Sequence, residues 1–442
     1  MNLNTKIKLV TDLLAPEFFG FFSGHREVAP ELPGQMEELL RSGSGETVAV
    51  DYEQGFARLI GGGQAVSFAA ARMAFYTAMK LLGIKEGDEI LLTGFTCSVM
   101  ANAVWRMGAT PVYADIDPGT FGTDPKDVER KLTARTRMIV AQHSFGIPCA
   151  IDEIAEIAKR RGIFLLEDCA LSVGSRMRGT TVGEWGDAAI FSTDHSKPLN
   201  TMTGGMLYTR DASLAARARE YQQSLPELSP AHQRRLWRRF LVERRWFHPH
   251  RYALGRLLAK ASTVPSKLRK RWSGLAEHTL LEGDFKPRLQ KGGYPYPARL
   301  PAFLARLGLE ELRRWTEERR KRQERLARYL ELANEVGLRE FLPPVYHDAE
   351  REIVPLRFIY THPQAKEIIR RMSRRIETDW IWFQEPIVCA PQGPASFQYT
   401  TGACPQAERV GGEIVNWPCV LPADMEAPLF KFFREVHTGL SS

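Results

Sequence analysis

The sequence of 442 residues has no apolar run long enough to cross a lipid bilayer. A membrane-spanning helix needs about 18 consecutive apolar residues. Residues 1–16 also carry neither a continuous apolar segment nor a small-residue cleavage site, which excludes the usual pattern of a secretory signal. We therefore expect a cytoplasmic protein, with peripheral contact at the inner membrane face as the one form of membrane association left open.

Cysteine is scarce, and its spacing excludes two further classes. The six cysteines are scattered without a C-x-x-C pair, and a long intracellular chain rarely builds a disulfide framework. There is no H-E-x-x-H motif, and His248 and His250 lie in a basic stretch without a nearby carboxylate or thiol. We expect free thiols and no metal site.

Composition and length indicate an ordinary globular protein with more than one core. The hydrophobic share of 44% and the charged share of 25% are close to average, and no repeat or low-complexity tract is present. The chain exceeds the roughly 250 to 300 residues that one core supports, so we expect two lobes with a cleft. A net charge of +8 permits an anionic partner but says nothing of the chemistry.

Short apolar runs alternate with amphipathic segments between Ala65 and Arg210. This alternation predicts βαβ units around a mostly parallel sheet, an α/β fold whose ligands bind beyond the carboxyl ends of the strands. The predicted strands are Glu89–Leu92, Pro111–Ala114, Arg137–Gln142, Ile163–Glu167, Asp187–Ser192 and Met206–Thr209. The predicted helices between them are Ala70–Leu82, Val99–Met107 and Ile151–Arg161.

We divide the chain into four parts. Residues 1–60 form an N-terminal arm, residues 61–225 a large domain, residues 226–292 a basic helical insertion, and residues 293–442 a small C-terminal α/β domain. A long charged helix over Leu309–Val336 leads into the last part.

The insertion carries arginine and lysine clusters interleaved with Trp237, Phe240, Leu241 and Trp246. Such a pattern suits an amphipathic helix on an anionic membrane, or a groove for a phosphorylated substrate or nucleic acid. A solvated helical face with its aromatic rings packed on the body explains the pattern more economically. We keep weak anionic membrane contact through residues 231–275 as an alternative and expect no nucleic-acid partner.

Three polar residues follow two of the predicted strands. Asp168 ends one strand, and Ser192 and Lys197 follow another, so all three would emerge at one edge of the sheet. A partly desolvated lysine has a lowered pKa and can attack an aldehyde. Pyridoxal phosphate also needs a buried acid to keep its ring nitrogen protonated, and Asp168 fits that role.

These residues stand in a specific run of motifs. The run comprises Glu167-Asp168-Cys169-Ala170, Gly186-Asp187, Phe191-Ser192 with Lys197, and Gly204-Gly205. It resembles the DegT/DnrJ/EryC1/StrS sugar aminotransferases, with their E-D-x-A and G-D-x-x-x-F-S-x-x-x-x-K segments. The resemblance covers about residues 65–210 closely and the chain from Gly293 onward less closely.

The resemblance implies a pyridoxal-phosphate enzyme of the aspartate-aminotransferase fold (fold type I) with a seven-stranded sheet. Lys197 would carry the cofactor as an internal aldimine and move the substrate proton, and Asp168 would pair with the pyridine nitrogen. Ser192 and the backbone amides of Arg72 and Met73 would hold the phosphate, where a helix start favours an anion. Arg72 would add a charged contact.

The chain departs from the family pattern around the cofactor. Ala71-Arg72 replaces the usual Gly-Thr pair, Cys97 takes the place of the aromatic ring that stacks on the cofactor, and Leu171 replaces a Gln or His. Pro295 stands where an asparagine reaches the partner subunit's phosphate. The departures indicate a divergent branch. His195, two residues before Lys197, is more economically a packed loop residue than a substrate contact.

By resemblance we expect a homodimer that transfers an amino group from glutamate to a keto sugar, most simply a nucleotide-linked one. One alternative is another pyridoxal-phosphate reaction on a ketone without a nucleotide. A second is a non-catalytic regulator or membrane-associated scaffold that keeps the fold.

Overall fold

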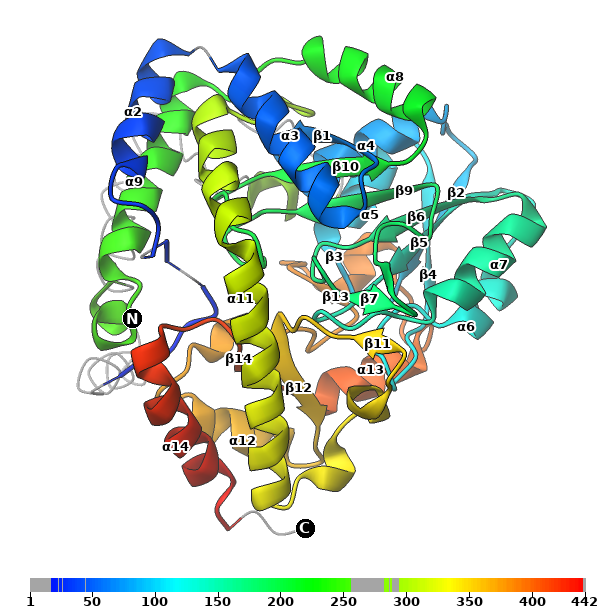
Figure 1. Ribbon diagram of the computed structural model, residues 1–442. Helices are drawn as coiled ribbons and strands as arrows, with labels where there is room; N and C mark the ends of the chain where they lie inside the picture. The colour runs from blue at the N-terminus through cyan, green and yellow to red at the C-terminus, as the bar shows by residue number, and fades with distance from the viewer. Residues whose placement is uncertain are drawn as a thin grey trace.

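The computed structural model describes residues 17–22, 24–25, 27–43, 45–255, 282–285, 287 and 294–439. A seven-stranded sheet lies between layers of helices, and a smaller C-terminal lobe lies beside it along one very long helix (Figure 1). Within the described residues, no helix is long and apolar enough to cross a lipid bilayer.

The sheet confirms the predicted mostly parallel, seven-stranded α/β architecture. Its order is β1-β10-β9-β6-β5-β2-β4, with parallel pairing from β9 to β4 and antiparallel pairing of β10 with β1 and β9. The strands are β1 Gln64–Phe68, β2 Glu89–Thr93, β4 Thr110–Ala114, β5 Thr136–Gln142, β6 Phe164–Asp168, β9 Ala188–Ser192 and β10 Gly205–Thr209. Only β1 has no counterpart among the predicted strands.

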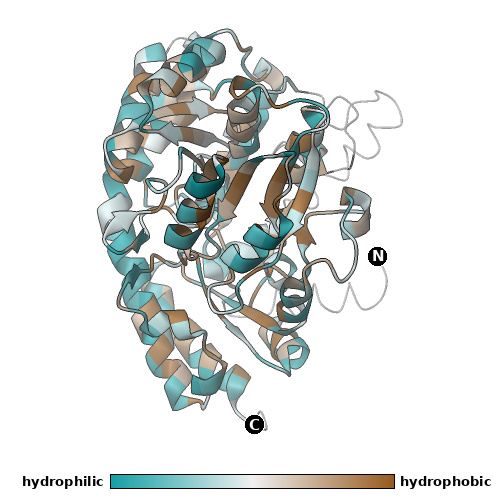
Figure 2. Ribbon diagram, turned by 90° about the vertical axis from the view of Figure 1, so that its right-hand side faces the viewer, coloured by the Kyte–Doolittle hydropathy of each residue, from teal (hydrophilic) through white to brown (hydrophobic). Residues whose placement is uncertain are grey.

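Both faces of the sheet are covered, as the continuous apolar runs of its strands require. Ile139 and Leu165 pack in a cluster under α7 (Ile151–Arg161), whereas Met138 and Leu166, their neighbours along β5 and β6, face the main core on the other side. In Figure 2 the strands are mostly hydrophobic and the outer helices carry hydrophilic residues. The helices associated with the sheet are α3 Glu46–Ile60, α4 Ala71–Leu81, α5 Ser98–Arg106, α6 Pro125–Lys131, α7 Ile151–Arg161 and α8 Ala212–Gln223.

The long helix α11 spans Ala302–Glu335, so the prediction that it starts at Leu309 was wrong by seven residues. Phe303, Leu304 and Leu307 are buried and extend the apolar stripe toward the N-terminus. Its 34 residues correspond to about 50 Å at 1.5 Å per residue. Helices α2 (Leu32–Ser42) and α3 pack against α11, and α14 (Glu426–His437) packs against it in the smaller lobe (Figure 1).

The C-terminal lobe is built on an antiparallel pair of strands and an aromatic core. Tyr329 stacks on Phe358 with ring centroids 4.8 Å apart, and Trp417 contacts Phe433 edge-on at 4.7 Å. Such pairs add to the stabilisation that burial gives. The elements are β12 Arg357–Thr361, β14 Ile414–Pro418, α12 Ala365–Met372, α13 Pro405–Glu413 and α14 Glu426–His437.

Two small sheets and several short helices complete the fold. The two-stranded sheet pairs β3 (Thr96–Cys97) with β13 (Ile387–Val388) and joins the large lobe to the C-terminal part of the chain. The three-stranded sheet contains β7 Arg176–Met177, β8 Thr180–Thr181 and β11 Arg351–Glu352. The 3₁₀ helices are η1 Glu282–Phe285, η2 Arg339–Phe341, η3 Pro344–His347, η4 Thr378–Trp380, η5 Pro394–Phe397 and η6 Ala423–Met425.

The predicted basic insertion begins as helix α9, Pro230–Trp246. Leu236 and Phe240 are buried against the body, while Arg234, Leu241 and Arg245 point outward. Residues 256–275 of the segment proposed for membrane contact lie outside the described residues, as does Gly293.

Candidate active site

The site lies where β6 and β9 end. These strands are parallel neighbours, Asp168 is the last residue of β6, and Ser192 is the last residue of β9. Lys197 lies in the loop that leads from β9 to β10. All three line one cavity of about 170 Å³. Polar side chains that follow two strands distant in sequence therefore meet at one edge of the sheet.

Glycine allows a close approach at one end of this cavity. A Cβ on Gly205 would lie 2.3 Å from the Ala71 backbone nitrogen, which no real structure tolerates. Only glycine therefore lets β10 pass so close to the start of α4. The first turn of α4 then faces the cavity beside Ser192, and the positive end of a helix favours an anion there.

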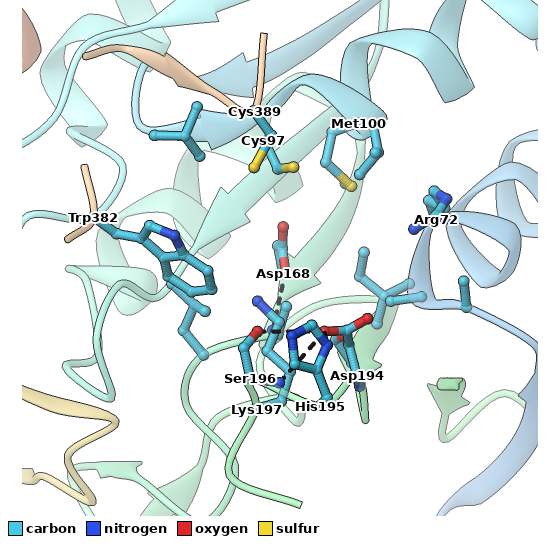
Figure 3. Close-up of a pocket in the computed structure, with 18 of the residues that line it drawn as sticks. Arg72, Cys97, Met100, Asp168, Asp194, His195, Ser196, Lys197, Trp382 and Cys389 are labelled. Atoms are coloured by element: carbon cyan, nitrogen blue, oxygen red, sulfur yellow. Dashed lines mark hydrogen bonds and ion pairs between the residues drawn. The ribbon is translucent and has the colours of Figure 1, made fainter. Parts of the chain in front are cut away.

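The Lys197 amine is buried among aromatic and charged groups. Its Nζ lies 4.4 Å from the centre of the Trp382 ring (Figure 3). Burial lowers the pKa of Lys197, and this effect outweighs the opposing influence of Asp194, Cys97 and Asp168. The uncharged, nucleophilic amine is thus available at a lower pH than on a solvated lysine.

Asp194 and His195 form an ion pair on the same loop, with Nδ1 of the histidine 2.8 Å from the carboxylate. Burial alone would raise the pKa of Asp194, but His195, Lys197 and Arg72 hold it at about 2. The His195 ring also stacks on Phe22 at 4.7 Å. The structure therefore places His195 at the cavity wall, and its ring packs on Phe22, in line with its interpretation as a packed loop residue.

The Asp168 carboxylate is buried, and Oδ1 accepts a hydrogen bond of 3.0 Å from the Ala170 amide. Burial raises the pKa of Asp168 despite that bond and the nearby Lys197. A buried carboxylate of this kind is stabilised by a cationic or N–H partner placed in the cavity.

A group of buried hydrogen bonds stabilises the strand that carries Asp168. His143, Glu167 and Cys169 form the one group within the described residues whose atoms could together bind a metal. The Glu167 oxygens already accept hydrogen bonds from the Gly183, Trp185 and Gly186 amides, and His143 Nε2 lies 3.1 Å from Glu167. These contacts satisfy the carboxylate, and we interpret the group as structural.

The other end of the cavity contains a contact that no sequence motif indicated. Arg72 Nε donates to Asp284 at 2.6 Å, and Arg106 Nη2 donates to the other oxygen of the same carboxylate at 3.2 Å. The Tyr296 hydroxyl donates to the Arg72 carbonyl at 3.1 Å. The Met73 side chain is fully buried, and its amide donates to the Ala70 carbonyl at 3.0 Å. Arg72 would therefore contact both Asp284 and an anion that binds in the cavity.

Residues 31–240 match the DegT/DnrJ/EryC1/StrS aminotransferase family. This part of the chain, just under half of its length, is identified with that family. Among curated relatives, 158 residues are 37% identical to the GDP-perosamine synthase of Escherichia coli O157:H7, and 166 residues are 39% identical to the L-glutamine:2-deoxy-scyllo-inosose aminotransferase of Streptomyces paromomycinus. The matches cover 36% and 38% of this chain and 43% and 39% of those relatives, so the chain spans less than half of their length.

The whole fold has counterparts among solved structures. The aminotransferase TlmJ from Streptoalloteichus hindustanus superposes with a TM-score of 0.68 over 96% of this chain and 99% of its own, at 23% identity. A likeness at this identity concerns the fold, and the predicted fold class is confirmed.

Three of the four departures from the family pattern line this cavity, at Ala71-Arg72, Cys97 and Leu171. Cys97 and Leu171 line it, and Leu171 is buried. The family's aminotransferases use pyridoxal phosphate, and the donor set here suits that group: a desolvated lysine, a buried carboxylate that lines the cavity, and a helix start beside a serine. Pro295, like every proline, offers no side-chain or backbone donor.

Sequence patterns did not single out several lining residues. Trp382, Phe383, Val388 and Cys389 come from one C-terminal segment. The resemblance from Gly293 onward was too loose to identify them.

Proposed function

We propose that this chain is a pyridoxal-phosphate-dependent aminotransferase that moves an amino group from glutamate to the keto carbon of a nucleotide-linked sugar. The observation that carries the proposal is the meeting of the Lys197 amine and the Asp168 carboxylate in one cavity, at the ends of neighbouring strands of the family's sheet.

The residues present divide the binding of the cofactor between them. Lys197 would bind its aldehyde carbon, Asp168 its ring nitrogen, and Ser192 with the start of α4 its phosphate. When bound, pyridoxal phosphate supplies an electron sink that acidifies the substrate Cα–H.

Lys197 is the group that moves the proton. Because burial lowers its pKa, the released amine can accept a proton from the substrate carbon and return it at a neighbouring position. Asp168 holds a proton or positive charge at the opposite end of the ring, and its buried position excludes water from that contact. Trp382 restricts where the Lys197 amine can lie.

A second candidate keeps the cofactor and changes the substrate to a ketone without a nucleotide. The cavity lining favours this candidate in one respect, because Trp380, Trp382, Phe383 and Phe285 present apolar rings. The printed name of the Streptomyces relative also gives L-glutamine as donor and 2-deoxy-scyllo-inosose as acceptor. The alternative without enzyme activity is a non-catalytic regulator or scaffold that keeps the fold.

Two features of the assembly belong to the proposal. We infer a homodimer from the family, and weak contact of α9 with an anionic surface. The support for the second is the set of outward-facing Arg234, Arg238, Leu241 and Arg245, at spacings of three or four residues along one side of the helix.

The test is a half-reaction. Purified protein loaded with pyridoxal phosphate is mixed with L-glutamate or L-glutamine without acceptor, and we expect one 2-oxo acid per active site, then steady turnover once a nucleotide-linked 4-keto or 3-keto sugar is added. Turnover with a free keto sugar or cyclitol ketone alone would favour the second candidate. A loaded protein that yields no 2-oxo acid from either donor would contradict the aminotransferase proposal.

A further inference from the structure

Two cysteines face each other at the wall of the cavity. Cys97 ends β3 in the large lobe, and Cys389 directly follows β13 in the C-terminal part of the chain. The two strands pair in parallel, with the Thr96 amide donating to the Pro386 carbonyl at 3.0 Å and the Ser98 hydroxyl donating to the Cys389 carbonyl at 2.7 Å. Figure 3 shows the two sulfur atoms side by side.

The backbone places both thiols within reach of a covalent bond. Val388 is the direct partner of Cys97, so Cys389 is one residue further along the same ladder. With neighbouring strands roughly 4.8 Å apart and a rise of about 3.3 Å per residue, the Cα atoms of Cys97 and Cys389 are expected about 6 Å apart, and a disulfide needs about 4.4 to 6.8 Å. Cys389 has a φ of 59°, which is rare for a residue with a side chain. This conformation departs from the strand alternation that would send its thiol to the opposite face from Cys97.

Thiol oxidation needs one thiol with a lowered pKa and a second thiol that solvent reaches, and each cysteine of the pair supplies one of these properties. A hydrogen bond from Cys389, the Val99 amide and the positive charges of Lys197 and Arg72 lower the pKa of Cys97 to about 7, against the effect of burial. Cys389 is exposed to solvent. A thiolate beside an accessible second thiol is the arrangement of redox-sensitive pairs.

The remaining cysteines lack this combination. Each of them is buried, and burial raises the pKa of three of their thiols to about 12. The buried cysteines are Cys149, Cys169, Cys404 and Cys419, with the raised values at the last three.

We propose that Cys97 and Cys389 form a reversible disulfide that closes the cavity to its cofactor. With a peroxide as oxidant, the Cys97 thiolate attacks one peroxide oxygen and becomes a sulfenic acid as the first water leaves. The Cys389 thiol then attacks that sulfur, the S–S bond forms, and the second water leaves. The two thiols give up two electrons and two protons, one hydrogen peroxide becomes two water molecules, and a dithiol reductant reverses the step.

The bond would act on the cavity through the segment that carries Cys389. Trp382 and Phe383 lie seven and six residues before it and form the wall over Lys197. A covalent link from Cys389 to β3 fixes this wall to the large lobe. The formation of the disulfide is independent of the proposed function; the loss of cofactor binding rests on it.

The test is oxidation of the full-length protein with hydrogen peroxide, followed by alkylation, non-reducing digestion and mass spectrometry. We expect a loss of about 2 Da in the intact mass, a fall from six to four free thiols, and one linked peptide pair containing Cys97 and Cys389 that dithiothreitol separates. Cys389→Ser should remove the linked pair, and Cys419→Ser, which changes a cysteine that directly follows β14 in the C-terminal lobe, should keep it. Sulfinic acid on Cys97 without a link, or a link between other cysteines, would overturn the proposal.

The second readout is absorbance after addition of pyridoxal phosphate to reduced and oxidised wild type. We expect the oxidised form to load at least tenfold less cofactor and to recover after reduction. A linked protein that loads normally would overturn the closing of the cavity. If the reduced protein takes up no cofactor, the proposed function fails, while the linked peptide still decides whether the disulfide forms.

Discussion

The two walls of the cavity differ in chemistry. The large lobe contributes charged groups, Asp168, Asp194, His195 and Lys197, whereas the C-terminal segment contributes Trp380, Trp382, Phe383 and Val388. Charges on the first wall sit on strand ends and a tight loop braced by buried hydrogen bonds, and the second wall is held by packing and by the β3–β13 pair. Under the proposed function, the charged wall would carry the reaction, and the aromatic wall would keep Lys197 buried and its pKa low.

The strongest test of this division removes the reacting amine. In Lys197→Ala we expect activity to fall by about a thousandfold or more, because nucleophile and proton carrier are lost together. Lys159→Ala, on the outer helix α7, should keep normal turnover and shows that loss of a lysine is not itself damaging. Turnover by Lys197→Ala within tenfold of wild type would contradict the assignment.

Asp168 should rank second. Asp168→Asn keeps the shape but not the charge, and we expect a fall in kcat of about a hundredfold to ten-thousandfold with the fold intact. Circular dichroism and cofactor absorbance separate an electronic effect from misfolding. An Asn variant that matches wild type would show that the carboxylate charge has no part in the reaction.

On the aromatic wall the effect should be smaller and should be visible in a pH profile. Trp382 lies against both Lys197 and the buried Arg357, whose guanidinium is 4.2 Å from the ring centre. Burial is the main cause of the lowered pKa of Lys197. Trp382→Leu should let water reach the amine and raise that pKa. The pH at which kcat rises should then move upward, with about a tenfold loss of kcat at neutral pH. Trp105→Leu, away from the cavity, should leave the profile unchanged; the same shift there would contradict a local effect.

Acid should affect the C-terminal lobe separately. Burial lowers the pKa of His437 from 6.5 to about 4, and its Nδ1 lies 2.6 Å from the Phe433 carbonyl. Since the unfolded histidine binds its proton at higher pH, stability is present above 6.5 and falls as the pH drops toward 4, by about 3 kcal/mol in total. Urea unfolding at pH 7 and 4.5 measures it, and His437→Gln should weaken the acid dependence. An unchanged dependence would place the sensitive group elsewhere.

The smallest expected effect is on the surface of α9. Each exposed arginine near an anionic membrane contributes about 1 kcal/mol. Sedimentation with phosphatidylserine vesicles should fall with salt and fall again in the Arg234→Glu, Arg238→Glu, Arg245→Glu variant. The same triple change on α7 and α11 at Arg160, Arg161 and Arg320 is the charge-matched control. Salt-independent or absent binding would support the solvated-face interpretation.

Much of the large lobe could be predicted because its signals are local. Ile151–Arg161 was placed to the residue by its apolar spacing and the glycine that follows it. The strand β1 was missed because three glycines precede it and it pairs at the sheet edge with β10, a partner distant in sequence. The start of α11 was missed because Pro301 and the first buried residues could equally end a loop.

Only the part of the candidate site that lies at the strand ends of the large lobe was predictable from the sequence. Strand ends identify Asp168, Ser192 and Lys197, because parallel strands share an edge. The ion pair of Arg72 with Asp284, separated by 212 residues, and the contact of Trp382 with Lys197 depend on tertiary packing that no local pattern encodes.

The most direct measurement is borohydride reduction of the protein after incubation with pyridoxal phosphate, followed by peptide mapping. The account predicts one reduced adduct per chain, on Lys197, with loss of the visible absorbance. An adduct on another lysine, or no adduct in protein shown to be folded and reduced, would contradict the central claim that this cavity is a pyridoxal-phosphate site.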